Sequence, residues 1–342
     1  MALQPIRRAI RTYANVGRLR RVLVVLIRHG MGDVVRRLHI DYYLRLSLWW
    51  LWRRAPRPEP QPRRLGQRIR AALVELGPTF VKLGQVLSTR PDLIPADVAE
   101  ELAGLQDQVP AEPFETVMEV IRSEGLTDAF EREIEHIEPE PIAAASMAQA
   151  HRARLRTGEE IVLKVQRPSV SEVLRSDIRL LEDLAALLER DEEIRDLFRP
   201  TELVRQFERS VEQELDFRRE GRTMDRFREI HRRNAGVHVP AVHWSLTTDR
   251  VLAMEFVDGI KISDTHALDA AGCDRSLVAR RTVDAMLQQI NEDGLFHGDP
   301  HPGNLRVLPG DVVCFLDFGI VGRIDADTQQ QLTDFLLAIV NR

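Results

Sequence analysis

Lysine is nearly absent from this chain. Among its 48 basic residues only Lys82, Lys164 and Lys261 are lysines, and all the others are arginines. A planar, permanently charged guanidinium cannot replace a compact ammonium where a phosphate or carboxylate requires one. Each retained lysine is therefore a candidate for a specific role, and two of the three lie inside motifs.

Cysteine, low-complexity tracts and long apolar runs are also scarce. The two cysteines, Cys273 and Cys314, are far apart and follow no metal or redox spacing, which predicts a reducing intracellular compartment without a disulfide framework. No uncharged run approaches the ~18 residues that span a bilayer, and the arginine-rich start lacks the pattern of a secretory signal. What remains is a chain of 342 residues, 44% of them hydrophobic, enough for more than one lobe.

The net charge of −5 is unevenly distributed. Residues 1–64 carry fifteen arginines against three acidic residues, which leaves the rest of the chain with a net charge of −17. An acidic body predicts no nucleic-acid partner. The basic arm contains the segment Leu-Trp-Trp-Leu-Trp at 48–52, and indoles with arginines favour a membrane surface or anionic lipids. A solvated basic helix pair packed on the body is the open alternative.

The periodicity of apolar residues predicts a helix-rich chain with a few strands. A helical stripe begins at Leu65 and restarts at Gly77-Pro78, and a hairpin turn at Gly158 precedes a strand over 161–165. Further predicted elements are helices over 96–108, after Pro113, over 171–190, 201–233, 276–291 and from near Asp325, and strands over 250–257 and 312–316.

Two polar motifs near the end of the chain carry the strongest chemical signal. His297-Gly-Asp299 is followed by Asn304, and Asp317-Phe-Gly comes after one short strand. In kinase-like enzymes the loop aspartate orients or deprotonates the attacking hydroxyl, while the asparagine and the Asp-Phe-Gly aspartate hold magnesium beside the phosphates. The order and spacing predict that Asp299 is catalytic and that Asn304 and Asp317 are metal ligands. His301 in the same loop either contacts phosphate or shapes the loop.

Lys164 lies in the β-branched strand Ile161-Val-Leu-Lys-Val, where a kinase places the lysine that grips the α- and β-phosphates. Such a lysine needs a helix glutamate to hold its ammonium. We assign that role to Glu214 on the 201–233 helix, with Glu212 and Glu220 as alternatives on the same helix.

The nucleotide would also require a loop over its phosphates and a hinge for its base. The small residues Ala143, Ala144, Ala145 and Ser146 precede the Lys164 strand. Their composition favours a packed helix start, whereas their position favours a nucleotide loop in which alanine lacks the freedom of glycine at positive φ. The backbone of Glu255 and Val257 would form the hinge.

Together with these motifs, Phe80-Val-Lys82-Leu-Gly-Gln85 and the segment that follows it resemble the KxGQ signature of the UbiB family of atypical protein-kinase-like proteins. The resemblance runs from about Leu19 to the end. It implies a bilobed, kinase-like α+β fold, ATP and Mg²⁺ as cofactors, and a gating role for Lys82 and Gln85 that makes phosphorylation of protein Ser, Thr or Tyr unexpected. It further implies ubiquinone biosynthesis, quinone-biosynthesis proteins as partners, and a cytoplasmic location at the periphery of a membrane.

Composition and the family resemblance together predict five regions in the chain. We expect a basic helical region over 1–52, a Pro/Arg-rich linker over 53–64, a helical extension with KxGQ over 65–140, an N-lobe with inserted helices over 141–257, and a C-lobe over 258–342. Two departures stand out. Gly221 occupies a helix position where the family usually has alanine, and the family usually continues well past residue 342 with further helices, so we expect an incomplete C-lobe.

The predicted function is an ATPase or small-molecule or lipid kinase that supports isoprenoid-quinone biosynthesis at a membrane. One alternative is a phosphotransferase of the aminoglycoside or choline kinase type, against which the KxGQ segment argues. The other is a non-catalytic nucleotide-sensing scaffold, against which the joint presence of Lys164, Asp299, Asn304 and Asp317 argues.

Overall fold

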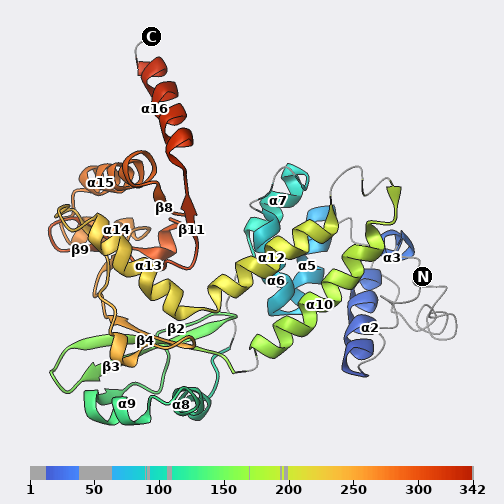
Figure 1. Cartoon of the computed structure of the whole chain (residues 1–342), viewed down its shortest axis with the longest axis horizontal. Helices are drawn as coiled ribbons and strands as arrows, with labels where there is room; N and C mark the ends of the chain where they lie inside the picture. Colours follow the sequence, from blue (N-terminus) through green and yellow to red (C-terminus); the bar gives the residue numbers. More distant parts are fainter. Residues whose placement is uncertain are drawn as a thin grey trace. The chain divides into compact units, whose positions relative to one another are not determined.

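The computed structural model describes residues 13–37, 64–88, 90, 93–105, 110–168, 170–192, 195 and 199–340. The tryptophan-containing segment predicted to contact a membrane and all of the predicted linker except Arg64 lie outside these residues. The chain divides into two compact units (Figure 1). The first unit comprises the described residues within 1–110, 145–147 and 167–211, and the second comprises those within 111–144, 148–166 and 212–342. The domain boundaries expected from the sequence remain a proposal.

The first unit is built from helices. Its helices are α2 (Tyr13–Arg28), α3 (Gly32–Arg37), α5 (Leu65–Leu76), α6 (Pro78–Ser88), α7 (Ala96–Ala103), α10 (Val170–Leu188) and most of α12 (Pro200–Glu214). Helices α5, α6 and α7 pack on one another, and the buried side chains of Leu73 and Leu102 lie beside Gly84 of α6. The predicted restart at Gly77-Pro78 is confirmed, because Gly77 adopts φ 103° between α5 and α6. Such a positive φ is readily adopted only by glycine.

The second unit begins with a small sheet covered by two helices. Its elements are α8 (Phe114–Ser123), α9 (Thr127–Glu133), β1 (Ile134–Ile137), β2 (Ala143–Ala144), β3 (Ala148–Leu155), β4 (Glu160–Gln166) and β6 (Val251–Glu255). The strands follow the order β1-β3-β4-β6, with β2 paired to β3. The pairs β3–β4 and β4–β6 are antiparallel, and the predicted turn at Gly158 is confirmed with φ 90°. Alternate residues of β4, such as Ile161, Leu163 and Val165, are buried in a core shared with α8 and α9.

A second hydrophobic core lies in the remainder of this unit. Its elements are α13 (Phe217–Ile230), β5 (Val237–His238), β7 (Ile260–Lys261), α14 (Thr265–Ala270), α15 (Arg275–Gln288), β8 (Leu295–His297), β9 (Leu305–Leu308), β10 (Val312–Phe315), β11 (Val321–Arg323) and α16 (Ala326–Val340). A four-stranded sheet has the order β5-β10-β9-β7, and β8 pairs with β11. Phe315, Phe318 and Phe227 are each about 1% exposed in this core. The α+β fold class predicted from the sequence is confirmed.

One predicted helix is wrong. The segment 201–233 forms two helices, α12 and α13, because Asp216 has the extended backbone of a helix cap and its side chain accepts a hydrogen bond from the Arg219 N–H. An N-terminal aspartate cap satisfies an otherwise unpaired amide and so starts a new helix. No helix in the described part of the chain is both long enough and apolar enough to cross a bilayer.

Candidate active site

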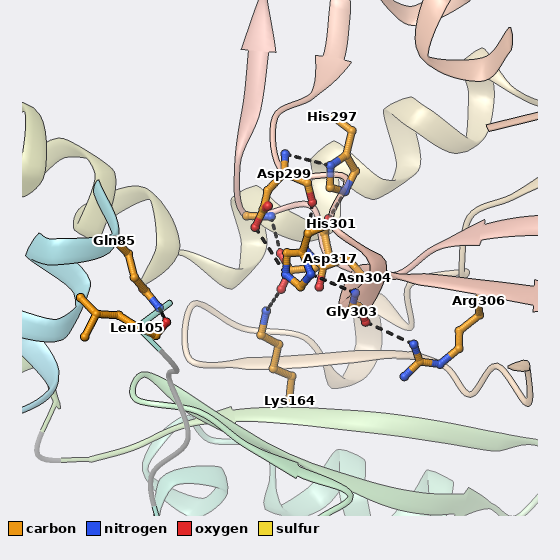
Figure 2. Close-up of polar contacts among 11 residues, drawn as sticks. Gln85, Leu105, Lys164, His297, Asp299, His301, Gly303, Asn304, Arg306 and Asp317 are labelled. Carbon is orange, nitrogen blue, oxygen red and sulfur yellow. Dashed lines mark hydrogen bonds and ion pairs between the residues drawn. The ribbon is translucent and has the colours of Figure 1, made fainter. Parts of the chain in front are cut away.

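Lys164 on β4 is held by two acidic side chains of the second unit, Glu220 and Asp317. Figure 2 shows its contact with Asp317. Its Nζ donates to both carboxylate oxygens of Glu220, at 2.9 and 3.0 Å, and lies 3.5 Å from Oδ2 of Asp317. The ammonium also lies 5.1 Å from the ring centroid of Phe217. Lysine, helix glutamate and Asp-Phe-Gly aspartate therefore form one charged cluster.

The structure corrects the predicted partner of Lys164. Glu220 on α13 binds the ammonium, whereas Glu214 is the last residue of α12 and contributes its negative charge to the field around Lys164. The prediction failed because the Asp216 cap breaks the expected single helix, and the new helix presents Glu220. Glu220 is 4% exposed, which is uncommon for a glutamate unless it is paired.

The electrostatics of this cluster keep Lys164 protonated. Burial disfavours the ammonium, but the carboxylates of Asp317 and Glu220 outweigh burial and raise the pKa of Lys164 well above its usual range. Burial of the Glu220 carboxyl raises its own pKa, and the attraction to Lys164 opposes that rise. Lys164 thus offers a fixed positive charge beside the Asp317 carboxylate.

His297 connects the loop of Asp299 to the Asp-Phe-Gly segment. Its Nδ1 accepts from the Asp299 N–H at 3.1 Å, and its Nε2 bonds to the Asp317 carbonyl, so the tautomer with a proton on Nε2 fits both contacts. The ring is 1% exposed and packs on Phe315 and Phe318. Burial lowers the pKa of His297, which favours the neutral ring that these two bonds require. The sequence marked His297 only as a motif member, because its two partners are backbone groups.

The loop between Asp299 and Asn304 is fixed by its own polar groups. The Asn304 Nδ2 donates to the Asp299 carbonyl at 3.2 Å, and the Leu316 N–H donates to the Asn304 carbonyl at 2.9 Å. His301 accepts from the Gly303 N–H at 2.9 Å, and its Nε2 lies 3.8 Å from Oδ2 of Asp299. His301 therefore shapes the loop, which was one of the two roles considered for it.

Asp317 and Asn304 supply the oxygen atoms that suit magnesium. Oδ1 of Asp317 accepts from the Gly319 N–H at 2.9 Å, and the carboxylate is 43% exposed. Because the amide nitrogen of Asn304 is used within the loop, its Oδ1 is the atom that remains for a cation. Among the described residues no group of three or more His, Cys, Asp or Glu side chains could hold a metal ion. Two protein oxygens fit Mg²⁺, which usually takes its other ligands from water and phosphate.

The alanine-rich segment is a strand and turn, so the predicted helix start is wrong. Ala143 and Ala144 form β2 and pair with Ala150 and Gln149 of β3. Ala145 and Ser146 belong to the first unit, where the Ala145 carbonyl accepts from the Arg167 Nε at 2.8 Å. The strands leave the nucleotide-loop role open as a prediction.

The predicted hinge begins at Glu255, which is the last residue of β6. The Glu255 N–H is already bonded to the Ala241 carbonyl at 2.8 Å. The Glu255 carboxylate accepts from His238 at 3.0 Å, and this hydrogen bond lowers the pKa of Glu255. The predicted binding of a base at 255–257 would therefore need other backbone atoms, such as those of Val257.

Lys82 and Gln85 both lie on α6 in the first unit. Lys82 is 9% exposed, and the Gln85 Nε2 donates to the Leu105 carbonyl at 3.3 Å. Packing explains Gly84 between them: a Cβ there would lie 2.4 Å from Cδ1 of Leu105 and 2.7 Å from Cδ1 of Leu73, so these leucine side chains would have to shift to admit it. The gating role of Lys82 and Gln85 stays a prediction.

Comparison with known proteins identifies the family. The sequence model of the ABC1 atypical kinase-like domain matches residues 104–342. A protein of Pseudomonas aeruginosa named probable protein kinase UbiB is 39% identical over 335 residues, which is 96% of this chain and 62% of that protein. An uncharacterised protein of Synechocystis is 40% identical over 82% of this chain and 48% of its own length. This chain thus spans about half to three-fifths of these relatives.

Similarity extends to solved structures. A Mycobacterium tuberculosis protein described as a complex of Rv3197 with erythromycin aligns with a TM-score of 0.50 and 26% identity, over 70% of this chain and 60% of that one. The kinase-like fold predicted from the motifs is confirmed by the family match. The chain belongs to the UbiB family and carries an ABC1 atypical kinase-like domain over residues 104–342.

Proposed function

We propose that this protein binds ATP with Mg²⁺ and acts as an ATPase or as a small-molecule or lipid kinase. The observation that carries the proposal is the cluster within the second unit, in which Lys164 is held 2.9 Å from Glu220 and 3.5 Å from Asp317. A permanently charged lysine beside a magnesium-binding aspartate is the arrangement with which kinases hold a triphosphate.

Each side chain has a proposed role in this chemistry. Lys164 would bind the α- and β-phosphates, with Glu220 as its positioning residue. Asp317 and Asn304 would hold Mg²⁺, which supplies charge neutralisation on the transferring phosphoryl group. Asp299 would orient a hydroxyl or water and accept its proton. Its carboxylate is 44% exposed and its backbone is fixed by His297 and Asn304, so it is accessible on a rigid loop.

We further propose a role in ubiquinone or related isoprenoid-quinone biosynthesis at the surface of a membrane. The UbiB relatives support the biosynthetic part by similarity, and the basic arm of residues 1–64 supports the attraction to anionic lipids. Quinone-biosynthesis proteins are the expected partners. The family resemblance also supports a gating role for Lys82 and Gln85, in which case Lys82→Ala would change the rate of ATP hydrolysis.

The test of catalysis is ATP hydrolysis in the presence of detergent or anionic vesicles. Wild-type protein should hydrolyse ATP only with Mg²⁺, and Asp317→Asn should reduce the rate at least about a hundredfold, because it removes the charge that holds the cation. Asp327→Asn is the matched control, since Asp327 is an exposed residue at the start of α16 and should retain the wild-type rate.

A non-catalytic scaffold would give the opposite result. If wild-type protein binds MgATP but hydrolyses it no faster than the Asp317→Asn variant, catalysis is excluded under these conditions and nucleotide sensing becomes the better account. If wild-type protein does not bind MgATP at all, the assignment of the cluster is wrong.

A further inference from the structure

The face of the sheet that carries Lys164 also carries two arginines. Side chains alternate along a strand, so Glu160, Val162 and Lys164 of β4 share one face. The register of β3 on β4 pairs Arg152 with Val162 and Arg154 with Glu160. Directly paired residues of antiparallel strands point to the same face, and Arg152 and Arg154 therefore lie on the face of Lys164.

The positions on this face form rows at increasing distance from Lys164. A strand advances about 3.3 Å per residue, which places the Val162 row roughly 7 Å and the Glu160 row roughly 13 Å from the Lys164 row. The Phe256 N–H donates to the Glu160 carbonyl at 3.1 Å, so the predicted hinge begins at the outer row. A nucleotide whose phosphates bind Lys164 and whose base reaches this hinge would place its ribose and base over the Val162 row, on the Lys164 side of the Glu160 row.

Arg152 lies in the Val162 row, and its guanidinium reaches Glu160 in the outermost row. Its guanidinium carbon lies 4.3 Å from the ring centroid of Phe256, and its Nη2 donates to the Glu160 carboxylate. The hydrogen bond from Arg152 lowers the pKa of Glu160, so the carboxylate stays ionised and the pair persists at neutral pH. A surface hollow of about 260 Å³ adjoins the pair; it is lined by Glu135, His136, Glu138, Arg152, Ala153, Arg154 and Glu160.

We propose that Arg152 binds the base and ribose end of the nucleotide, with its planar guanidinium against the face of the base. A guanidinium that is already fixed by Glu160 and Phe256 loses little conformational freedom on binding, and it stacks favourably on an aromatic face. Arg154 shares Glu160 at 3.2 Å but lies in the outermost row and is 56% exposed. The inference rests on the proposed function, because Lys164 must bind the phosphates for the base to reach Arg152.

The test compares a ligand that has a base with one that has none. Affinities for MgATP and for magnesium tripolyphosphate are measured by isothermal titration calorimetry on wild type, Arg152→Ala, Arg152→Lys and Arg154→Ala. Arg152→Ala should weaken MgATP binding about tenfold and leave tripolyphosphate binding within about twofold. Arg152→Lys, which keeps the charge but loses the planar fork, should also weaken MgATP selectively. Arg154→Ala is the matched control and should leave both affinities near wild type.

The outcomes separate this inference from the proposed function. If wild type binds neither ligand, the nucleotide site itself is wrong. If wild type binds both, the inference is overturned by an Arg152→Ala variant that binds MgATP as wild type does, or that loses both ligands equally. Thermal unfolding of each variant checks that the sheet is intact. If Arg152→Ala is misfolded, the comparison of Arg152→Lys with Arg154→Ala tests the inference instead.

Discussion

At the scale of single residues, the structure distinguishes Glu220 from Glu214, two glutamates that the sequence offers as partners of Lys164. Both Glu214 and Glu220 influence the charge of Lys164, but the bidentate contact belongs to Glu220. Glu220→Gln should therefore lower kcat/KM for ATP hydrolysis by roughly a hundredfold, because a lysine that moves by about 1 Å no longer meets the phosphates.

The matched control is Glu214→Gln, which removes a nearby negative charge and keeps the Lys164–Glu220 contact. It should change kcat/KM by less than about tenfold. Steady-state kinetics at saturating Mg²⁺ check both variants, and a larger loss in Glu214→Gln than in Glu220→Gln would contradict the structural assignment. Glu220→Asp should lose activity as well, since its shorter side chain keeps the charge without the reach.

Gly221, where the family resemblance led us to expect alanine, has a structural explanation. A Cβ at this position would lie 3.0 Å from Cη2 of Trp244 and 3.4 Å from Val242. The indole is held in place by a 2.8 Å hydrogen bond from its Nε1 to Asp225. Glycine costs a helix about 1 kcal/mol relative to alanine, and here that cost allows Trp244 to pack against α13.

At the scale of elements, a part-buried ion pair between Arg18 and Asp177 joins α2 to α10 in the first unit. The Arg18 guanidinium donates twice to Asp177, both at 2.7 Å, and once to the Leu76 carbonyl at 3.0 Å. The Asp177 side chain is 0% exposed. Removing one partner of such a pair leaves a buried charge without compensation, which costs far more than the pair itself contributes.

We therefore expect Arg18→Met to lower the free energy of unfolding by about 3 kcal/mol. Arg21→Met is the control on the same helix; Arg21 donates to the Glu75 carbonyl on the exposed surface, so its loss should cost no more than about 0.5 kcal/mol. The double variant Arg18→Met, Asp177→Leu should recover most of the loss. Urea unfolding followed by circular dichroism measures all three, and equal losses in the two single variants would refute the argument.

At the scale of the whole molecule, the separation of charge is the dominant feature. Residues 1–64 are strongly basic and the remainder is acidic. Each arginine near an anionic membrane contributes about 1 kcal/mol of attraction, screened by salt. The chain should then sediment with vesicles of equimolar phosphatidylcholine and phosphatidylglycerol, less so at high salt, and not with phosphatidylcholine alone.

Substitution by glutamine of the five arginines in residues 53–64 should weaken this binding at least tenfold. The matched control replaces five exposed arginines of α13 by glutamine: Arg218, Arg219, Arg222, Arg226 and Arg228. These lie in the acidic body and should contribute little. Equal losses of vesicle binding in the two variants would indicate attraction to net charge alone. Unchanged binding by the variant of residues 53–64 would show that these arginines do not contribute to membrane binding.

The sequence by itself determined which residues are candidates for the site. Order and spacing predict Asp299, Asn304, Asp317 and Lys164, because kinase-like phosphate chemistry requires these residue types on consecutive loops and a strand. The β4 strand and the turn at Gly158 were equally readable, since β-branched residues and a glycine with positive φ are local signals.

Tertiary structure alone decided the partners. Whether Glu214 or Glu220 binds Lys164 depends on Asp216, which caps the second of two helices. The apolar periodicity of 201–233 predicts helix but does not reveal the point at which one helix ends and the next begins. The link made by His297 uses backbone groups of Asp299 and Asp317, which leave no trace in residue identity. The place of Arg152 on the face of Lys164 follows from the register of β3 on β4, and register is set by packing across strands that no single segment of sequence contains.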